Sequence, residues 1–323
     1  MPTDRRKILA GTAATLAASA FPNVTLAKSV ADAQQAPGFY RFKLGDMTLT
    51  VVNDGARTFP MPDGFVKNAS KDEALAAASA AYMPAGQVTI PFNPVVIDTG
   101  GKLVLFDTGN GPTPNAPVGK LMANLKAAGI GAGDIDTVVI SHMHPDHING
   151  LKDVDGKVAF PNAEIMVSSP DWAFWMSEEN AAKAASPMAK NYFANAKKVM
   201  GDMSDRVKRY EPGKEVAPGV TAVEAFGHTP GHVAFAVASG DKRLLVQSDV
   251  TNIPSFFLRN PDWHVAFDND PVMAQATRHK IYDMAAAEKM PVIGYHFSFP
   301  SAGYVEKDGA KYRLVPVNWS PVI

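Results

Sequence analysis

Four side chains with metal-binding donor atoms lie within six residues, at His142, His144, Asp146 and His147. They directly follow the apolar run 137–141, which is typical of a strand buried on both faces. On a helix, His142 and His144 would point to opposing sides, and on a continued strand His147 would point away from the other three. Only a tight turn at the end of the strand brings the four donors together, so we expect a metal site there.

Three further donor residues each follow a predicted strand: His228 in a Gly-His-Thr-Pro-Gly-His turn, Asp249 and His296. A single histidine is more often a core or loop residue than a ligand. Seven donor residues, each placed after a strand, rarely arise by chance, so we interpret the set as one site. The chain has no cysteine, which excludes disulfides, thiolate ligands and a cysteine nucleophile. Any metal must therefore bind histidine and carboxylate groups.

The elements that position these residues are short strands and a few helices. Apolar runs alternate with turn signals from residue 38 onward, and the segment 171–200, interrupted by Pro187, is interpreted as two surface helices. No repeat, low-complexity tract or Gly/Ser linker follows residue 37, so we expect one domain built from two similar β-rich halves. The predicted strands are 39–44, 47–52, 94–98, 103–107, 137–141, 220–226, 233–238, 244–247 and 292–295, and the other predicted helices are 121–128 and 272–289.

Composition and charge limit the classes of function. With 323 residues, 46% hydrophobic and 20% charged, the chain has the composition of a globular protein with a large core. Its net charge of −1 gives no electrostatic footprint for a phosphate backbone or an anionic membrane. We therefore expect a small-molecule substrate and no nucleic-acid partner.

The N-terminal segment has the pattern of an export signal. A basic Arg-Arg-Lys at 5–7 precedes the Ala-rich apolar run 8–20, and the small residues at 18–20 suit a signal peptidase. The paired arginines favour twin-arginine export to the periplasm or the medium. About 13 apolar residues are too few to span about 30 Å of hydrocarbon, so we expect no stable membrane association after processing. The expected division is a signal and N-terminal segment, 1–36, and one catalytic domain, 37–323.

The His-x-His-x-Asp-His motif, the Gly-His-Thr-Pro-Gly-His turn, the strand-end aspartate and the late histidine together resemble the signature of the metallo-β-lactamase superfamily. The resemblance runs from about residue 38 to the C-terminus. It implies an α/β fold of αββα type, in which two mixed sheets pack face to face with helices outside. Within the superfamily the chain is similar to the methyl parathion hydrolase-related branch, on the stretches 36–40, 124–129, 160–163, 296–300 and 315–319.

The resemblance also implies how the donors divide between two metal ions. One ion is expected on His142, His144 and His228, a second on Asp146, His147 and His296, with Asp249 bridging. Neutral imidazoles suit Zn²⁺, or alternatively Mn²⁺, Fe²⁺ or Co²⁺, and the two carboxylates offset the positive charge. Two such ions about 3.5–4 Å apart can share a hydroxide that is nucleophilic at neutral pH. Asp146 is the expected catalytic residue, which orients that nucleophile and transfers its proton.

Two residues are expected to support ligands instead of binding metal. Asp107, in Phe-Asp-Thr-Gly, resembles the superfamily's acidic residue at a strand end, and His232 closes the turn that begins at Gly227. Ordinary turn chemistry is the alternative for Asp107. His264 and His279 lie outside any motif, and we expect them in the core or in solvent.

An apolar substrate pocket is expected beside the metals, and the alternative is that its aromatic residues only pack the helical insertion onto the sheets. The chain departs from the methyl parathion hydrolase branch in segment 250–270 and in the loop after 103–107, so organophosphate specificity is not carried over. The predicted wall residues are Trp175, Phe193, Phe256 and Phe299.

The function expected from these features is metal-dependent hydrolysis of an ester-like substrate, either a lactone or aryl ester or an organophosphate triester. A β-lactam hydrolase is a weaker alternative, because the β-lactam hydrolases of the superfamily usually have a cysteine ligand or lack the bridging aspartate. A di-iron redox protein is another, but it would normally carry a flavin domain. A metal-free binding protein would lack ligands, and none is missing here. A homodimer is expected by resemblance only.

Overall fold

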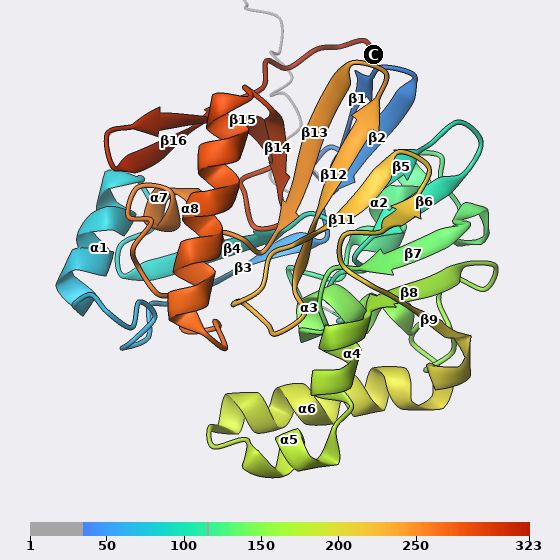
Figure 1. Cartoon of the computed structure of the whole chain (residues 1–323), viewed down its shortest axis with the longest axis horizontal. Helices are drawn as coiled ribbons and strands as arrows, with labels where there is room; N and C mark the ends of the chain where they lie inside the picture. The colour runs from blue at the N-terminus through green and yellow to red at the C-terminus, as the bar shows by residue number, and fades with distance from the viewer. Residues whose placement is uncertain (1–34, 115) are drawn as a thin grey trace, which may run out of the picture. The chain divides into compact units, whose positions relative to one another are not determined.

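Two seven-stranded sheets contain most of the strands of this protein, whose computed structural model describes residues 35–114 and 116–323 (Figure 1). Residues 1–34 of the predicted signal segment lie outside the described residues. The first sheet has the order β1-β2-β5-β6-β7-β8-β9, and β6 to β9 run parallel. Its strands are β1 (Phe39–Leu44), β2 (Met47–Val52), β5 (Val95–Asp98), β6 (Leu103–Phe106), β7 (Thr137–Ile140), β8 (Glu164–Ser168) and β9 (Val207–Tyr210).

The second sheet keeps the chain order from β10 to β16. Its neighbours are antiparallel except β13 and β14, which are parallel. Both sheets are therefore mixed, as expected. The strands are β10 (Glu215–Ala217), β11 (Val220–Glu224), β12 (Val233–Ser239), β13 (Lys242–Ser248), β14 (Pro291–Gly294), β15 (Ala302–Asp308) and β16 (Lys311–Pro316).

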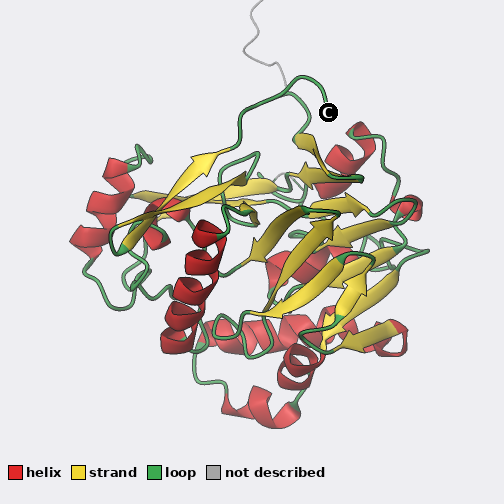
Figure 2. Ribbon diagram, turned by 45° about the horizontal axis from the view of Figure 1, so that its top comes forward, coloured by secondary structure: helices red, strands yellow, loops and turns green. Residues whose placement is uncertain are grey.

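The two sheets pack against each other, and helices cover their outer faces (Figure 2). Strand β7 shows how the sequence produces these layers. Val139 points into the core between the sheets, where it joins Phe106 and Phe235. Val138 and Ile140 point the other way, into a second core beneath the helices. The run of three apolar residues is thus buried on both faces, and the predicted αββα sandwich is confirmed.

The helices begin where the sequence provides capping residues. Pro187 is the first residue of α6, whose cap Ser186 accepts a hydrogen bond from the Ala189 N–H at 3.1 Å. Segment 171–200 forms three helices where two were predicted, because Ser177 caps a further short helix, α5. The helices are α1 (Lys71–Ala80), α2 (Leu121–Ala127), α3 (Pro145–Ile148), α4 (Ser169–Trp175), α5 (Glu178–Lys183), α6 (Pro187–Met200), α7 (Pro254–Phe257) and α8 (Pro271–Ala287).

A two-stranded sheet, β3 (Gly55–Pro60) paired with β4 (Gln87–Phe92), was not predicted from the sequence. We call it the β3–β4 arm. It packs with α1 and α7 in a separate apolar cluster that contains Val88 and Phe256 (Figure 1). None of the helices in the described part of the chain has the length and apolar character needed to cross a membrane.

Candidate metal centre

The seven predicted donors meet at one edge of the sandwich because each follows the end of a strand. His142 lies two residues beyond β7, and Asp249 directly follows β13. His296 lies two residues beyond β14, which runs parallel to β13, so the carboxyl ends of these two strands lie side by side. His144 is the N-cap of the four-residue helix α3, which turns the chain and carries the next two donors.

Every predicted donor belongs to a group of three whose ligand atoms lie within 4.8 Å of one another. In the first group, His144 Nδ1 lies 3.0 Å from His142 Nε2 and 3.0 Å from His228 Nε2. The other groups are His142, His147 and Asp249, and Asp146, His147 and His296.

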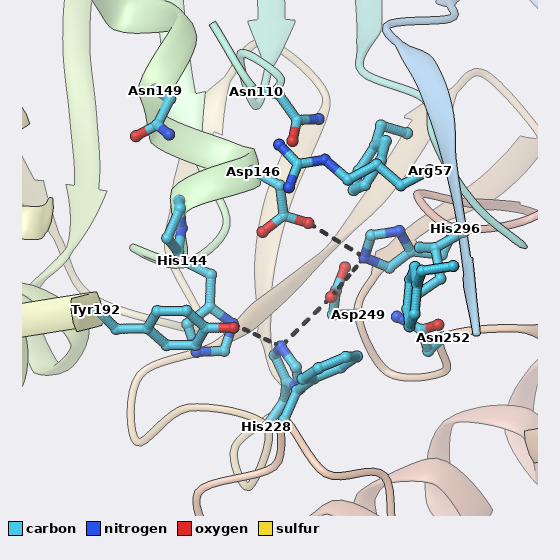
Figure 3. Close-up of a pocket in the computed structure, with 15 residues that line it drawn as sticks. Arg57, Asn110, His144, Asp146, Asn149, Tyr192, His228, Asp249, Asn252 and His296 are labelled. Atoms are coloured by element: carbon cyan, nitrogen blue, oxygen red, sulfur yellow. Dashed lines mark hydrogen bonds and ion pairs between the residues drawn. The ribbon is translucent and has the colours of Figure 1, made fainter. Parts of the chain in front are cut away.

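Asp249 lies between these groups. Its Oδ2 atom is 3.3 Å from His228 Nε2 and 3.0 Å from His296 Nε2 (Figure 3). Its Oδ1 atom is 3.4 Å from His147 Nε2. The side chain is 4% exposed. One oxygen of this carboxylate therefore lies between His228 and His296, and the other faces His147 of α3.

The donor set fits divalent cations. The Nε2 atoms of His144 and His147 and the Oδ1 atom of Asp249 are buried without a hydrogen-bond partner among the described residues, which is rare for buried polar atoms. Burial and the neighbouring imidazoles lower the pKa of His142 well below its usual value, so its lone pairs stay available for coordination. Imidazole groups gathered around a carboxylate in this way are a typical site for a first-row metal ion.

The negative field of the carboxylates also favours a cation. Burial opposes protonation of His147, but Asp249, Asp107 and Asp146 together raise its pKa well above the usual value. Burial likewise opposes protonation of His296, and Asp249 and Asp146 raise its pKa. A bound cation would meet the same demand for positive charge.

Asp107 and His232 lie where they can orient ligands. Asp107 accepts hydrogen bonds from the Ser141 N–H and hydroxyl, both at 2.8 Å, and its Oδ2 is 2.9 Å from His147 Nδ1. The Asp249 N–H donates to His232 Nε2 at 3.0 Å, while His232 Nδ1 is 2.8 Å from the Ala225 carbonyl. Burial lowers the pKa of His232 to about 3, so it is a neutral acceptor for the Asp249 backbone.

Sequence reasoning missed Asp268, which orients His228. Its Oδ1 is 2.9 Å from His228 Nδ1, and the buried Arg278 lies 3.8 Å from its Oδ2. Asp268 lies 40 residues after its partner in segment 250–270, where no motif marks it. Tyr295 was also missed, although it precedes His296: its ring stacks on that of His147 at 4.0 Å, and its hydroxyl donates to the Asp146 carbonyl.

Asp171 was missed as well, and it joins the two histidine-bearing loops. Its carboxylate is fully buried and accepts hydrogen bonds from the Met143 N–H at 2.6 Å, the Thr229 hydroxyl and the Gly231 N–H at 3.2 Å. Burial raises its pKa to about 6. Asp171 stands in the first turn of α4, where acidic residues are common, so nothing in the sequence marked it as buried.

A cavity of about 300 Å³ opens beside the donors (Figure 3). His144, Asp146, His228, Asp249 and His296 form its base. The β3–β4 arm contributes Arg57, Phe59, Ile90 and Phe92, and the remaining lining residues are Asn110, Pro145, Asn149, Tyr192, Asn252 and Phe267.

The four predicted wall residues do not line this cavity. Trp175 and Phe193 are buried between the helices and the first sheet, where the Trp175 ring meets His144 edge-on from outside the cavity at 5.5 Å. Phe256 is fully buried beneath the β3–β4 arm, and Phe299 is exposed. Trp175 and Phe193 pack in the helical layer and line a neighbouring cavity, while the β3–β4 arm forms the wall of the metal-centre cavity.

This chain is similar in sequence and in fold to proteins of one known superfamily. The family model described as the metallo-beta-lactamase superfamily matches residues 91–294. No curated protein matches. Among solved structures, the dizinc quorum-quenching lactonase AidC is 26% identical, with a TM-score of 0.82 over 88% of this chain and 98% of that chain. The hydrolase AbOPH is also 26% identical, with a TM-score of 0.82 over 89% and 100%. A probable metal-dependent hydrolase from Staphylococcus aureus, 22% identical with a TM-score of 0.71 over 87% and 100%, shares the fold.

Proposed function

The chain belongs to the metallo-beta-lactamase superfamily, and within it we propose a dinuclear metal-dependent hydrolase that cleaves ester-like substrates, foremost lactones or aryl esters. The position of Asp249 carries this proposal. Its two oxygens lie near His228, His296 and His147, so one carboxylate can contact two ions at once. His142, His144 and His228 would hold one ion, and Asp146, His147 and His296 the other.

Two divalent ions in this donor set would polarise a substrate carbonyl and lower the pKa of a water molecule toward neutrality. Asp146 is the carboxylate placed to handle protons, because it lines the cavity with 26% of its side chain exposed whereas Asp249 is nearly inaccessible. Its Oδ2 atom lies 3.6 Å from both His147 Nε2 and His296 Nε2. From there it can accept the proton of an attacking water and return it to the leaving oxygen.

Tyr192 also lines the cavity and supplies a hydrogen-bond donor there. Its ring packs on that of His144 at 4.7 Å, and its hydroxyl points toward the donors (Figure 3). Burial, with the charges of Asp146 and Asp249, raises the pKa of this hydroxyl above its usual value, so it keeps its proton at neutral pH. It can therefore donate to the substrate oxygen on which negative charge develops during hydrolysis.

The cavity lining favours an organic ester over a highly charged substrate backbone. Phe59, Ile90, Phe92 and Phe267 offer an apolar surface, and about 300 Å³ suits a small molecule. The similarity to AidC, a dizinc quorum-quenching lactonase, supports a lactone as the first substrate to test.

Metal analysis combined with a hydrolysis panel tests this proposal. The purified, metal-loaded protein would be assayed with an N-acyl lactone, an aryl ester, methyl parathion and a β-lactam. We expect two ions per chain and turnover of the lactone or the aryl ester. Metal-replete protein that hydrolyses none of the first three substrates would contradict the proposal, and exclusive hydrolysis of the β-lactam would replace it by that alternative.

A further inference from the structure

Arg57 places a positive charge in the wall of the metal-centre cavity, and no neighbour in residues 35–114 or 116–323 neutralises it. No carboxylate oxygen of these residues lies within 4.0 Å of its guanidinium, and the guanidinium donates no hydrogen bond to them. Figure 3 shows the guanidinium on the same side of the cavity as Asn110 and Asp146. A planar group with five donors therefore faces the space that a substrate would enter.

An arginine without a partner is unusual within this protein. Each of the other seven arginines in the described part of the chain has a hydrogen-bond, ion-pair or aromatic partner. These arginines are Arg41, Arg206, Arg209, Arg243, Arg259, Arg278 and Arg313.

Strand geometry directs Arg57 toward the cavity. Arg57 pairs with Ile90 and Phe59 with Val88 in the β3–β4 arm, so these side chains share one face of the two-stranded sheet. Ile90, Phe59 and Arg57 all line the cavity. Thr58 points to the opposite face, where its hydroxyl bonds that of Thr89 at 2.9 Å. If the register of β3 shifted by one residue, the Arg57 side chain would point away from the cavity.

A second donor lines the same cavity. Asn149 accepts a hydrogen bond from the Asn195 side chain through its Oδ1 at 2.8 Å, and its own amide N–H groups have no acceptor among the described residues. The Asn110 amide, in contrast, is committed to Asp54 at 3.0 Å. The wall thus offers an unpaired guanidinium and an unpaired amide, both of which are donors that suit an anionic oxygen.

We propose that Arg57 is a specificity-determining residue, which favours ester substrates that carry a carboxylate group away from the scissile bond. The inference rests on the proposed hydrolase function, because it concerns which ester the metal centre receives. Asp146 and Asp249 would not repel such a substrate, since the charge of two divalent ions would outweigh that of the two carboxylates. The apolar residues beside Arg57 would contact the hydrocarbon chain that joins the ester to the carboxylate.

A matched pair of substrates isolates the charge. We would compare the 4-nitrophenyl monoester of adipic acid, which has a free carboxylate, with its neutral methyl ester. The measured quantity is kcat/KM for the carboxylate substrate divided by kcat/KM for the methyl ester, obtained with metal-loaded protein. We expect this ratio to fall by up to about fivefold in R57A, as for the loss of one solvent-accessible ion pair, to fall less in R57K and to fall further in R57E.

The control variant is T58A, which changes the neighbouring residue on the opposite face of the arm and should keep the wild-type ratio. Metal content and thermal unfolding of each variant identify effects on folding. A ratio that changes less than twofold in both R57A and R57E would overturn the inference while leaving the hydrolase proposal intact. A metal-replete wild-type protein that hydrolyses neither ester nor any lactone would overturn the proposed function, and the inference with it.

Discussion

His147 and Asp107 form a buried pair in which the histidine Nδ1 lies 2.9 Å from the carboxylate Oδ2. The same carboxylate is bound by the Ser141 N–H and hydroxyl, so its position is fixed from three directions. Because Nδ1 is engaged there, Nε2 of His147 is turned toward Asp249 and Asp146. The pair therefore sets both the tautomer and the orientation of a proposed ligand.

Replacing Asp107 by Asn should weaken metal binding without removing a proposed ligand. The asparagine amide is neutral, and its NH2 group would face the Ser141 and His147 donors that the carboxylate now accepts from. His147 would therefore lose its orienting partner. We expect metal affinity or kcat/KM to fall about 10–100-fold, which is typical for the loss of such a partner. Titration of the metal-free variant with Zn²⁺ measures this. The exposed D155N variant is the control, and equal affinities in the two variants would contradict the role of Asp107.

Replacing Asp249 by Ala should have a larger effect, because Asp249 contacts three of the histidines. We expect fewer than two ions per chain and a fall in kcat/KM of more than about 100-fold, beyond the effect of an outer partner. Metal content after dialysis and steady-state kinetics check both. Full metal content together with unchanged activity would show that Asp249 does not bridge two ions.

Metal removal should reduce stability as well as activity. In the metal-free protein, the buried His147 Nε2 and Asp249 Oδ1 atoms have no hydrogen-bond partner among the described residues. An ion at about 1,000 times its Kd adds about 4 kcal/mol to the free energy of unfolding, which corresponds to a Tm change of about 5–10 °C for a domain of this size. Calorimetry with and without a chelator measures it. An H264A variant should behave like the wild type, and a chelator that leaves Tm unchanged would argue against structural coupling.

The donor residues could be predicted from the sequence because each lies in a short motif directly after a strand. His142 to His147 occupy one turn, and parallel β13 and β14 bring Asp249 and His296 to the same edge without any information from loops. The fold could be predicted for the same reason, since the apolar run of β7 already indicated a strand with two buried faces.

The cavity wall could not be predicted, because it depends on how distant segments pack. Arg57 and Phe92 reach the site through an arm whose strands are separated by a helix and were not recognised. Trp175 and Phe193 were predicted to line the cavity because they are aromatic, yet their large side chains pack between the helices and the sheet. Asp268 is 40 residues from the histidine it orients, so only the tertiary structure joins them.

Replacing Asp171 by Ala should destabilise the protein. The change leaves the Met143 and Gly231 N–H groups and the Thr229 hydroxyl without their acceptor in a buried place. Each such donor costs about 1–3 kcal/mol, and partial relaxation gives an expected loss of about 3–5 kcal/mol in the free energy of unfolding. Urea unfolding of metal-loaded protein at pH 8 tests this. A loss below about 1 kcal/mol would mean that Asp171 does not hold the two loops together.

Replacing Tyr192 by Phe separates the two contributions of this side chain. The ring would still pack on His144, so metal content, Tm and, within about threefold, KM should stay the same. The hydroxyl, which keeps its proton because burial raises its pKa, would be lost as a donor to the developing negative charge. We expect kcat to fall about 10–100-fold, somewhat less than for a fully enclosed donor. A Y192A variant should in addition raise KM, because it removes the ring from the cavity wall. If Y192F instead keeps the wild-type kcat, the hydroxyl does not act on the transition state and Tyr192 serves only to pack against His144.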